Sequence, residues 1–149
     1  MAEKKQLVGG LNDQKHIDEI IAKVNSDEEF LKQAKKLTVK TQNLMLDVPG
    51  GIDRLISWEL ENGKIISGKA EEKPAPSDWR KEKIDKNKID LRATAGYEVS
   101  VKLYNKEINA TMAIMSGRYK MQGSVKKIIG LMTEMTLWAD LVSTVPCEV

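Results

Sequence analysis

At 149 residues, 41% of them hydrophobic and 31% charged, the chain has the length and composition of one water-soluble domain with a sizeable core. The net charge of +2 argues against a nucleic-acid binder, and the single cysteine, Cys147, excludes an internal disulfide. The sequence shows no apolar run of membrane-spanning length and no secretory signal, so we expect a cytoplasmic protein.

The N-terminal part of the chain predicts a flexible tail over residues 1–10, followed by one domain over residues 11–149. Four apolar residues at helical spacing predict the first helix: Ile17, Ile20, Ile21 and Val24. Residues 26–29, Ser-Asp-Glu-Glu, match a capping box in which Ser26 would start a second helix.

Beyond residue 38 the apolar spacing changes to two, which indicates strands. Within residues 43–48, the alternation predicts that Leu44, Leu46 and Val48 share the buried face, and that Met45 lies on the opposite face. The sequence Pro-Gly-Gly at 49–51 then ends this strand in a turn.

The clearest local signal is a hairpin over residues 54–70. Apolar and polar residues alternate up to Leu60, and Asn62-Gly63 is a preferred centre of a type I′ turn because both residues tolerate positive φ. A two-residue turn there pairs Leu60 with Ile65 on the same face as Trp58.

Residues 71–88 mix both charge signs with two prolines, and we expect a surface excursion anchored by Trp79. A strand with Leu91 and Ala93 facing inward follows and ends at Gly96.

Residues 97–115 predict two short helices broken near Asn109, and a short strand around Tyr119 and Met121 comes next. Ser124 is the expected N-cap of a last helix that is apolar on more than one face. Such a helix needs more than one partner, or a ligand. Hairpin-linked strands with helices on one side predict an α+β domain with a largely antiparallel sheet.

Few residues in the chain are suited to catalysis or metal binding. Its one histidine, His16, is expected to lie solvated on the first helix, and with one cysteine a His/Cys zinc site is not available. The glycine pairs match neither a phosphate-binding loop nor a dinucleotide motif. We therefore expect no enzyme activity, no metal and no cofactor.

Positive charge gathers towards the C-terminal end. Between Glu107 and Glu134 the chain has no acidic residue, but it has four basic ones: Arg118, Lys120, Lys126 and Lys127. Such a cluster attracts an anionic head group or an acidic membrane surface. The alternative is a solvated edge that keeps the sheet from pairing with another chain.

Residues 110–135 resemble the C-terminal core of the sterol carrier protein-2 family. The family pattern is an apolar helix, a Met-Ser-Gly-basic-x-Lys-x-x-Gly strand and a helix that opens with a basic pair. It is matched here by Met115, Ser116, Gly117, Arg118, Lys120, Gly123 and Lys126-Lys127. The hairpin at 56–64 is also similar to the family's central hairpin, and the resemblance extends over about residues 38–135. Residues 71–88 are longer than the usual link, and the final Cys-Glu-Val is not a peroxisomal signal.

The resemblance implies a five-stranded, mostly antiparallel sheet with helices on one side and a hydrophobic tunnel between them. The implied function is binding, and transfer, of a fatty acid, a fatty acyl-CoA or a sterol-like lipid, without chemistry. The residues expected to line the cavity are Leu44, Leu46, Ile56, Trp58, Met112, Met115, Ile128, Leu131, Met132, Met135 and Trp138. The four basic residues would hold an anionic head group, and the last helix would act as a lid.

The expected partners are therefore a lipid or fatty-acyl ligand and, transiently, an anionic membrane surface, with no nucleic acid. The alternative is a structural or interaction domain that uses its apolar last helix for homodimerisation or for docking to a partner.

Overall fold

The structure is a computed structural model that describes residues 10–148, without the side chains of residues 110, 111, 125 and 128. At its centre is a five-stranded sheet. Its order is β3-β2-β1-β4-β5, with β1 (Val39–Val48), β2 (Ile52–Glu61), β3 (Lys64–Pro74), β4 (Leu91–Gly96) and β5 (Tyr119–Gly123). Neighbouring strands are antiparallel except β1 and β4, which are parallel. The predicted α+β class with a five-stranded, mostly antiparallel sheet is confirmed.

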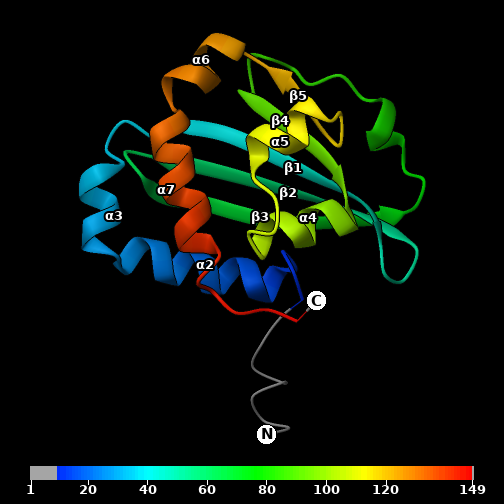
Figure 1. Cartoon of the computed structure of the whole chain (residues 1–149), viewed down its shortest axis with the longest axis horizontal. Helices are drawn as coiled ribbons and strands as arrows, with labels where there is room; N and C mark the ends of the chain where they lie inside the picture. The colour runs from blue at the N-terminus through cyan, green and yellow to red at the C-terminus, as the bar shows by residue number, and fades with distance from the viewer. Residues whose placement is uncertain (1–9, 149) are drawn as a thin grey trace, which may run out of the picture.

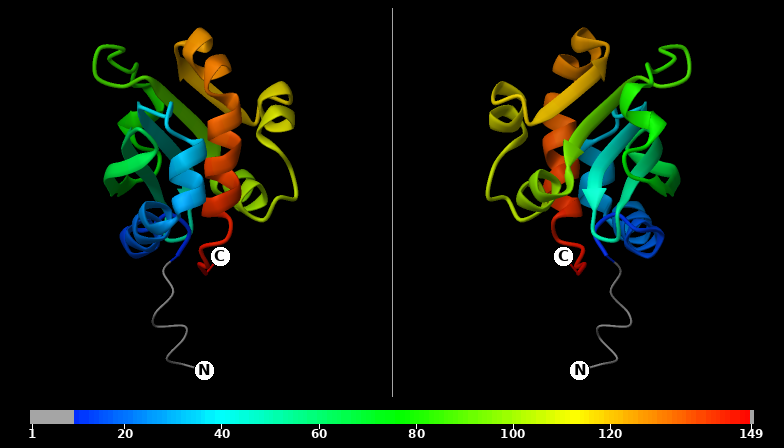
Figure 2. Two further views of the ribbon diagram at one scale, coloured as in Figure 1. Left: turned by 90° about the vertical axis from the view of Figure 1, so that its left-hand side faces the viewer. Right: turned by 90° about the vertical axis from the view of Figure 1, so that its right-hand side faces the viewer.

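Helices cover one face of the sheet and one of its edges (Figure 1, Figure 2). They are α2 (Gln14–Ser26), α3 (Glu28–Gln33), α4 (Tyr97–Tyr104), α5 (Ala110–Met115), α6 (Val125–Gly130) and α7 (Met132–Val142). We call the covered side, which carries Met45, Ile56 and Trp58, the helix face. The side that carries Leu44 and Leu55 is the back face, where a short 3-10 helix, η1 (Asp78–Lys81), lies.

Aspartates start the first two helices. Asp13 accepts from the backbone N–H of His16 at 2.9 Å, and Asp27 accepts from that of Phe30 at 2.9 Å. The prediction that Ser26 caps α3 is wrong, because the Ser26 hydroxyl donates to the carbonyl of Lys23 and closes α2. A charged carboxylate one residue later is the stronger acceptor for the free N–H groups of the helix start.

Helix α2 protects the outer edge of β3 with two amide side chains. Asn25 accepts from the Ile65 N–H at 2.8 Å and donates to its carbonyl at 3.0 Å. Gln14 makes the equivalent pair with the Ala70 N–H at 2.9 Å and the Gly68 carbonyl at 3.2 Å. These bonds occupy backbone groups that would otherwise invite pairing with another chain.

The predicted hairpin is confirmed in turn type and register. Asn62 and Gly63 have φ of 52° and 84°, and Leu60 pairs with Ile65. Both paired side chains belong to the core on the helix face, together with Trp58.

The predicted orientation of β1 is wrong for Leu44 and Leu46. Met45 and Val48 point to the helix face, whereas Leu44 and Leu46 contact Trp79 on the back face. Leu44 and Leu46 are on the back face because the strap covers that face too, so apolar residues line both sides of the strand. Val48 leaves their face because of a register irregularity between Met45 and Val48, where Asp47 adopts a φ of 54°. The extra residue brings Val48 to the face of Met45, so strict alternation along the whole strand does not hold.

The segment of residues 75–90, which we call the strap, connects β3 at one edge of the sheet to β4 near the other. It crosses the back face, where Trp79 is buried against Leu44 and Leu55. Trp79 therefore anchors the excursion as predicted. Residue Lys73 at the end of β3 adds a cation–π contact, with its Nζ 4.6 Å from the Trp79 ring centroid.

The C-terminal half matches the prediction up to its last helix. Asn109 caps α5 by accepting from the Met112 N–H, and Ser124 precedes α6 with its hydroxyl accepting from the Lys127 N–H. The expected single last helix is instead two, because α6 ends at Gly130 and α7 begins at Met132.

The first and last residues of the described part of the chain meet around His16. This residue is fully buried, so the prediction of a solvated histidine is wrong. Its Nδ1 accepts from the Asn12 N–H at 3.0 Å, so Nε2 carries the proton and donates to the Val145 carbonyl at 3.1 Å. Tyr104 also donates to that carbonyl. Of the predicted tail, residues 1–9 lie outside the described residues, and Gly10 forms a bridge with Glu148.

Candidate functional site

The region expected to bind a ligand lies between the helix face of the sheet and α7. Ile56 and Trp58 are buried there, and the Trp138 ring of α7 stacks edge-on against Trp58 with centroids 5.1 Å apart. Leu131 and Met135 pack partly buried against the same core. Of the eleven residues predicted to line a cavity, these five come together: Ile56, Trp58, Leu131, Met135 and Trp138.

The other predicted lining residues lie elsewhere. Leu44 and Leu46 face the strap, as described above. Met112, Met115 and Met132 are exposed, with Met115 at 83%, so the prediction that they face the interior is wrong. Met112 and Met115 lie on α5, a six-residue helix too short for its apolar spacing to show which side is covered, and Met132 is the first residue of α7. The side chain of Ile128 lies outside the described residues.

Helix α7 covers the sheet without being buried in it. None of its eleven described residues is buried, whereas α2 buries His16, Ile17, Ile20 and Val24. Among the described residues, one polar side chain of α7 contacts another part of the protein: Asp140 forms an ion pair with Lys106, Oδ1 to Nζ at 3.1 Å. Both of these side chains are more than half exposed. Exposed ion pairs contribute little to stability, so apolar contacts hold α7 in place.

A small apolar pocket opens where α6 and α7 meet the sheet. It is lined by Val39, Thr41, Asp90, Leu91, Lys127, Leu131 and Met135, and its volume of about 10 Å³ is that of roughly one water molecule. Its walls come from β1, β4 and the α6–α7 junction, and Lys127 pairs with Asp90 at its rim, Nζ to Oδ1 at 3.0 Å. The interior next to the basic edge is therefore nearly filled by side chains in this conformation.

The four basic residues do not form one cluster. Lys127 is neutralised by Asp90, and Lys120 pairs in register with Thr94 opposite Leu44, which places it on the back face. Arg118 and Lys126 are exposed and form no ion pair with any residue in the described part of the chain. Three of the four charges, those of Arg118, Lys120 and Lys126, therefore have no ion-pair partner in the described chain, and of these Lys120 lies on the back face.

A larger hollow of about 500 Å³ lies on the opposite side of the molecule, beside the start of α2. Polar residues dominate its walls, which are Asp13, Gln14, Lys15, Arg54, Ala70 and Glu72. Arg54 is already paired there with Glu72 at 2.7 Å and donates to the carbonyl of Leu11 at 2.8 Å. This open polar hollow does not suit an apolar ligand.

Sequence reasoning missed the charged groups that hold the strap on the back face. The buried carboxylate of Asp53 accepts from the Ser77 hydroxyl at 2.7 Å and from Arg80 at 2.8 Å. The hydrogen bonds from Arg80 hold the pKa of Asp53 well below its usual range. Asp53 therefore stays charged and bound to its partner, which suits a structural role and not proton transfer.

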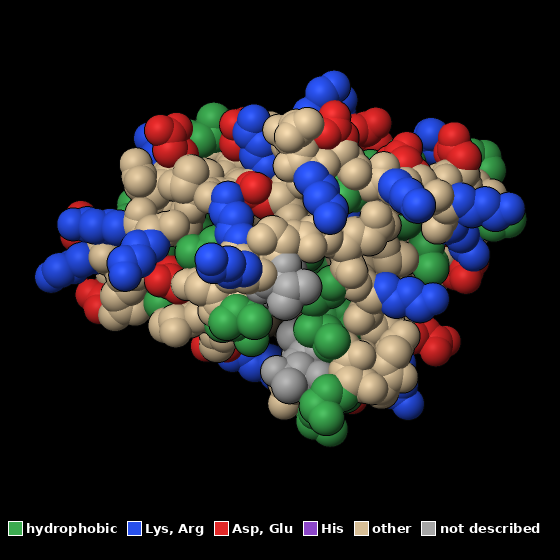
Figure 3. All heavy atoms as spheres, turned by 90° about the horizontal axis from the view of Figure 1, so that it is seen from above, with side chains coloured by type: hydrophobic (Ala, Val, Ile, Leu, Met, Phe, Trp, Pro, Cys, Tyr) green, Lys and Arg blue, Asp and Glu red, His purple; other side chains and the backbone are tan. Residues whose placement is uncertain are grey.

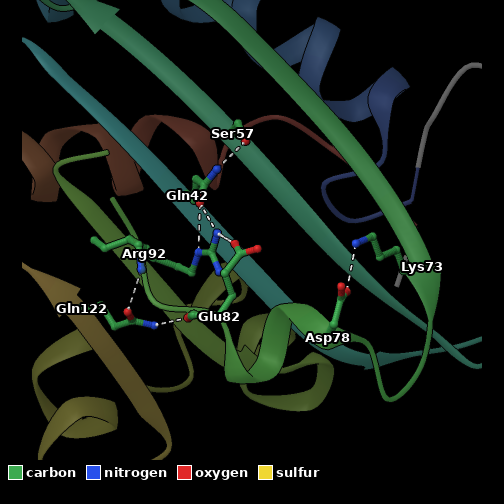
Figure 4. Close-up of polar contacts among 8 residues, drawn as sticks. Gln42, Ser57, Lys73, Asp78, Glu82, Arg92 and Gln122 are labelled. Atoms are coloured by element: carbon green, nitrogen blue, oxygen red, sulfur yellow. Dashed lines mark hydrogen bonds and ion pairs between the residues drawn. The ribbon is translucent and has the colours of Figure 1, made fainter. Parts of the chain in front are cut away.

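A second group joins the strap to β1, β4 and β5 (Figure 4). Buried Arg92 donates from Nε to Gln42 at 2.9 Å and from Nη2 to Glu82 at 2.6 Å, and Gln122 accepts from the Ile84 N–H. No signal in the sequence singles out these residues, because their partners are 10 to 50 positions away.

Neither a metal centre nor a membrane span is found in the part of the chain that the structure describes. No group of three or more His, Cys, Asp or Glu residues there could hold a metal ion. No helix over residues 10–148 is both long and apolar enough to cross a bilayer.

Several solved structures share this architecture. A conserved hypothetical protein of Thermus thermophilus, described as a possible sterol carrier protein, superposes with a TM-score of 0.73 over 95% of this chain and 96% of its own, at 15% identity. A crystal structure of sterol carrier protein 2 gives 0.69 over 91% and 99%, also at 15% identity. The apo form of the Yarrowia lipolytica sterol carrier protein 2 gives 0.52 over 93% and 94%, at 17% identity.

The same fold also occurs as one part of an enzyme. A sec-alkylsulfatase from a Pseudomonas species matches with a TM-score of 0.53 at 14% identity, over 88% of this chain but only 16% of its own. No protein-family model and no curated protein matches the chain in sequence. The fold of this protein is thus that of sterol carrier protein 2.

Proposed function

We propose that this protein binds a lipid between the helix face of its sheet and α7, and that it carries this ligand without performing chemistry on it. A fatty acid, a fatty acyl-CoA or a sterol-like molecule would suit this site. The sterol carrier protein 2 fold supports the proposal. The observation on which it mainly rests is that α7 covers an apolar sheet face with side chains that are only partly buried, above an apolar pocket.

Binding requires α7 to move, because a pocket of about 10 Å³ does not hold an acyl chain. Each buried CH₂ group of a ligand contributes about 0.8 kcal/mol, so some ten carbons would contribute roughly 8 kcal/mol before the entropy costs of binding. That gain can replace the contacts that Leu131, Met135 and Trp138 lose when α7 lifts. Met135 is flexible and can adapt to ligands of different shape.

An anionic head group would lie at the rim of the pocket. Lys127 is already there, and release from Asp90 would free its charge for a carboxylate or a phosphate. Arg118 and Lys126, which have no ion-pair partner in the described chain, would add to the attraction.

The test is titration of the purified protein with a fluorescent fatty acid, together with native mass spectrometry and lipid extraction. Met135→Trp fills the pocket and should weaken long-chain binding by about tenfold or more, which corresponds to about 1.4 kcal/mol. Met132→Trp adds the same ring at an exposed position and should leave binding unchanged. Circular dichroism checks that both variants are folded.

Two results would contradict the proposal. One is the absence of any bound lipid and of any titration across several lipid classes. The other is equal binding by the Met135→Trp variant and the wild type, which would place the ligand outside this pocket. A tight dimer in sedimentation, without lipid, would favour the alternative of an interaction domain. Against that alternative, Leu137, Leu141 and Val142 of α7 already pack on the protein's own core.

A further inference from the structure

Most of the large apolar side chains that are exposed in the described part of the chain lie on α5, α6 and the first residue of α7. Of the six large hydrophobic residues that are exposed among the described residues, five lie here, and we call them the apolar cap: Met112, Ile114, Met115, Ile129 and Met132. Met115 and Ile129 are 83% and 68% exposed. The sixth, Ile66, lies on β3. A concentration of this kind marks a contact surface, whereas single exposed apolar residues do not.

The charges around the apolar cap are positive. The chain has no acidic residue between Glu107 and Glu134, and the exposed Arg118 and Lys126 fall within this span without an ion-pair partner among the described residues. Seen from above, several hydrophobic side chains lie near one another on this face, with lysine and arginine side chains and some acidic side chains beside them (Figure 3). An apolar centre with a cationic rim is the composition of surfaces that lie in the interface of anionic membranes.

A second copy of the chain fits this surface less well. In a two-fold symmetric contact between apolar caps, the basic rim of one copy would face the basic rim of the other, and no carboxylate between residues 107 and 134 would compensate these charges. An anionic lipid surface offers the opposite charge and a fluid interior for the methionine side chains.

We propose that the apolar cap docks this protein on an anionic lipid membrane. Its Met and Ile side chains would enter the boundary between head groups and acyl chains, and Arg118 and Lys126 would contact lipid phosphates. Because α6 also carries Lys127 at the rim of the apolar pocket, docking would bring the pocket to the membrane surface. This last consequence rests on the proposed lipid-carrier function, whereas docking itself does not.

The test is co-sedimentation with phosphatidylcholine vesicles, with and without phosphatidylglycerol. Wild-type protein should bind the phosphatidylglycerol vesicles and lose this binding at high salt. The Arg118→Gln/Lys126→Gln variant should bind them at least about tenfold more weakly, since each basic residue near the surface contributes about fivefold. The Met115→Ser/Ile129→Ser variant should also bind more weakly, and it should do so at every salt concentration at which the wild type still binds.

Matched controls come from β3, which also has exposed apolar and basic side chains. Ile66→Ser controls for the loss of an exposed apolar residue, and Lys64→Gln/Lys69→Gln controls for the loss of two charges. Both should bind vesicles like the wild type. Docking through the apolar cap is refuted if the wild type does not bind anionic vesicles, or if the β3 variants lose as much binding as the cap variants.

Fatty-acid titration without vesicles separates this proposal from the lipid-carrier function. The Met115→Ser/Ile129→Ser variant should bind the fluorescent fatty acid like the wild type while it fails to bind vesicles. Fatty-acid binding without any vesicle binding would overturn docking alone. Sedimentation that shows a dimer which the same variant dissociates would also overturn docking, in favour of self-association.

Discussion

Asp53 illustrates how much of this structure depends on single buried polar residues. Its carboxylate is fully buried on the back face and accepts hydrogen bonds from Ser77, Arg80 and the backbone N–H of Asp47. Arg54 is its neighbour in sequence, yet Arg54 points to the other face and pairs with Glu72. The alternation of side chains along β2 separates these two neighbours, and only the path of the strap brings Arg80 to Asp53.

Replacing Asp53 should therefore be costly. In Asp53→Asn one acceptor oxygen becomes an NH₂ group that faces the donors of Ser77 and Arg80. Breaking a buried charge pair in this way should lower the free energy of unfolding by about 3 kcal/mol. Urea denaturation followed by circular dichroism measures this change.

The control is Asp47→Asn, since Asp47 also pairs with Arg80 at 2.8 Å but its side chain is 75% exposed. It should cost less than about 1 kcal/mol. Equal losses for the two variants would show that the buried position of Asp53 does not matter.

Among the elements, the strap and α7 cover opposite faces of the sheet by different means. The strap is fixed by one buried ring, Trp79, and by ion pairs to the sheet that involve Arg80 and Arg92. Helix α7 has an edge-on ring contact and partly buried apolar residues instead. Directional bonds hold the strap in one position, whereas the apolar contacts of α7 can be exchanged for those of a ligand.

Removal of the anchoring ring should release the strap. Trp79→Ala leaves a cavity beside Leu44 and Leu55 and should destabilise the protein by about 3 kcal/mol or more. Trypsin should then cleave faster at the lysines of the strap, Lys81, Lys83, Lys86 and Lys88.

Lys73→Gln is the matched control, because it keeps the buried ring and removes the cation–π contact together with the exposed ion pair of Lys73 with Asp78, Nζ to Oδ1 at 2.9 Å, and it should cost at most about 1 kcal/mol. Unchanged cleavage in Trp79→Ala would mean that the ion pairs alone keep the strap in place.

At the scale of the whole molecule, His16 links the beginning of the domain to its end. It is buried against the carbonyl of Val145, and the edge of the Tyr104 ring faces it at 5.7 Å between centroids. The charged or titratable groups near it are Asp13 and Glu19 on its own side, and Tyr104 and Cys147 from α4 and the C-terminal segment. Burial lowers the pKa of His16 more than these carboxylates raise it.

Stability should therefore fall in mild acid. Because the folded pKa lies below the ordinary value of 6.5, the unfolded chain takes up the proton first as the pH falls. The contribution of the neutral ring is present above pH 6.5 and is lost below it, by up to about 1.4 kcal/mol per pH unit.

Urea unfolding at about pH 7.5 and about pH 5.5 measures this loss. The chain has one histidine, so His16→Gln should remove most of the pH dependence in this range. If the variant and the wild type show the same pH dependence, another group is responsible for it.

The sequence by itself determined the class of the fold, a first helix around residues 17–24, the hairpin with its type I′ turn, the break at Asn109 and the anchoring role of Trp79. These features follow from local spacing, turn chemistry and the presence of one large apolar residue in a polar segment. Local physics extends only a few residues, and even within that range the prediction missed Asp27 as the cap of α3 and the break between α6 and α7.

Only the tertiary structure decided which apolar side chains line the interior. The strap covers the back face and buries Leu44 there, the bulge at Asp47 brings Val48 to the face of Met45, and the separation of α6 from α7 left Met132 at the surface. The tertiary structure also buried His16, and it paired Asp53 with Arg80, which is 27 positions away in the sequence. Burial and pairing of this kind depend on contacts between segments far apart in the chain, which periodicity within one segment does not encode.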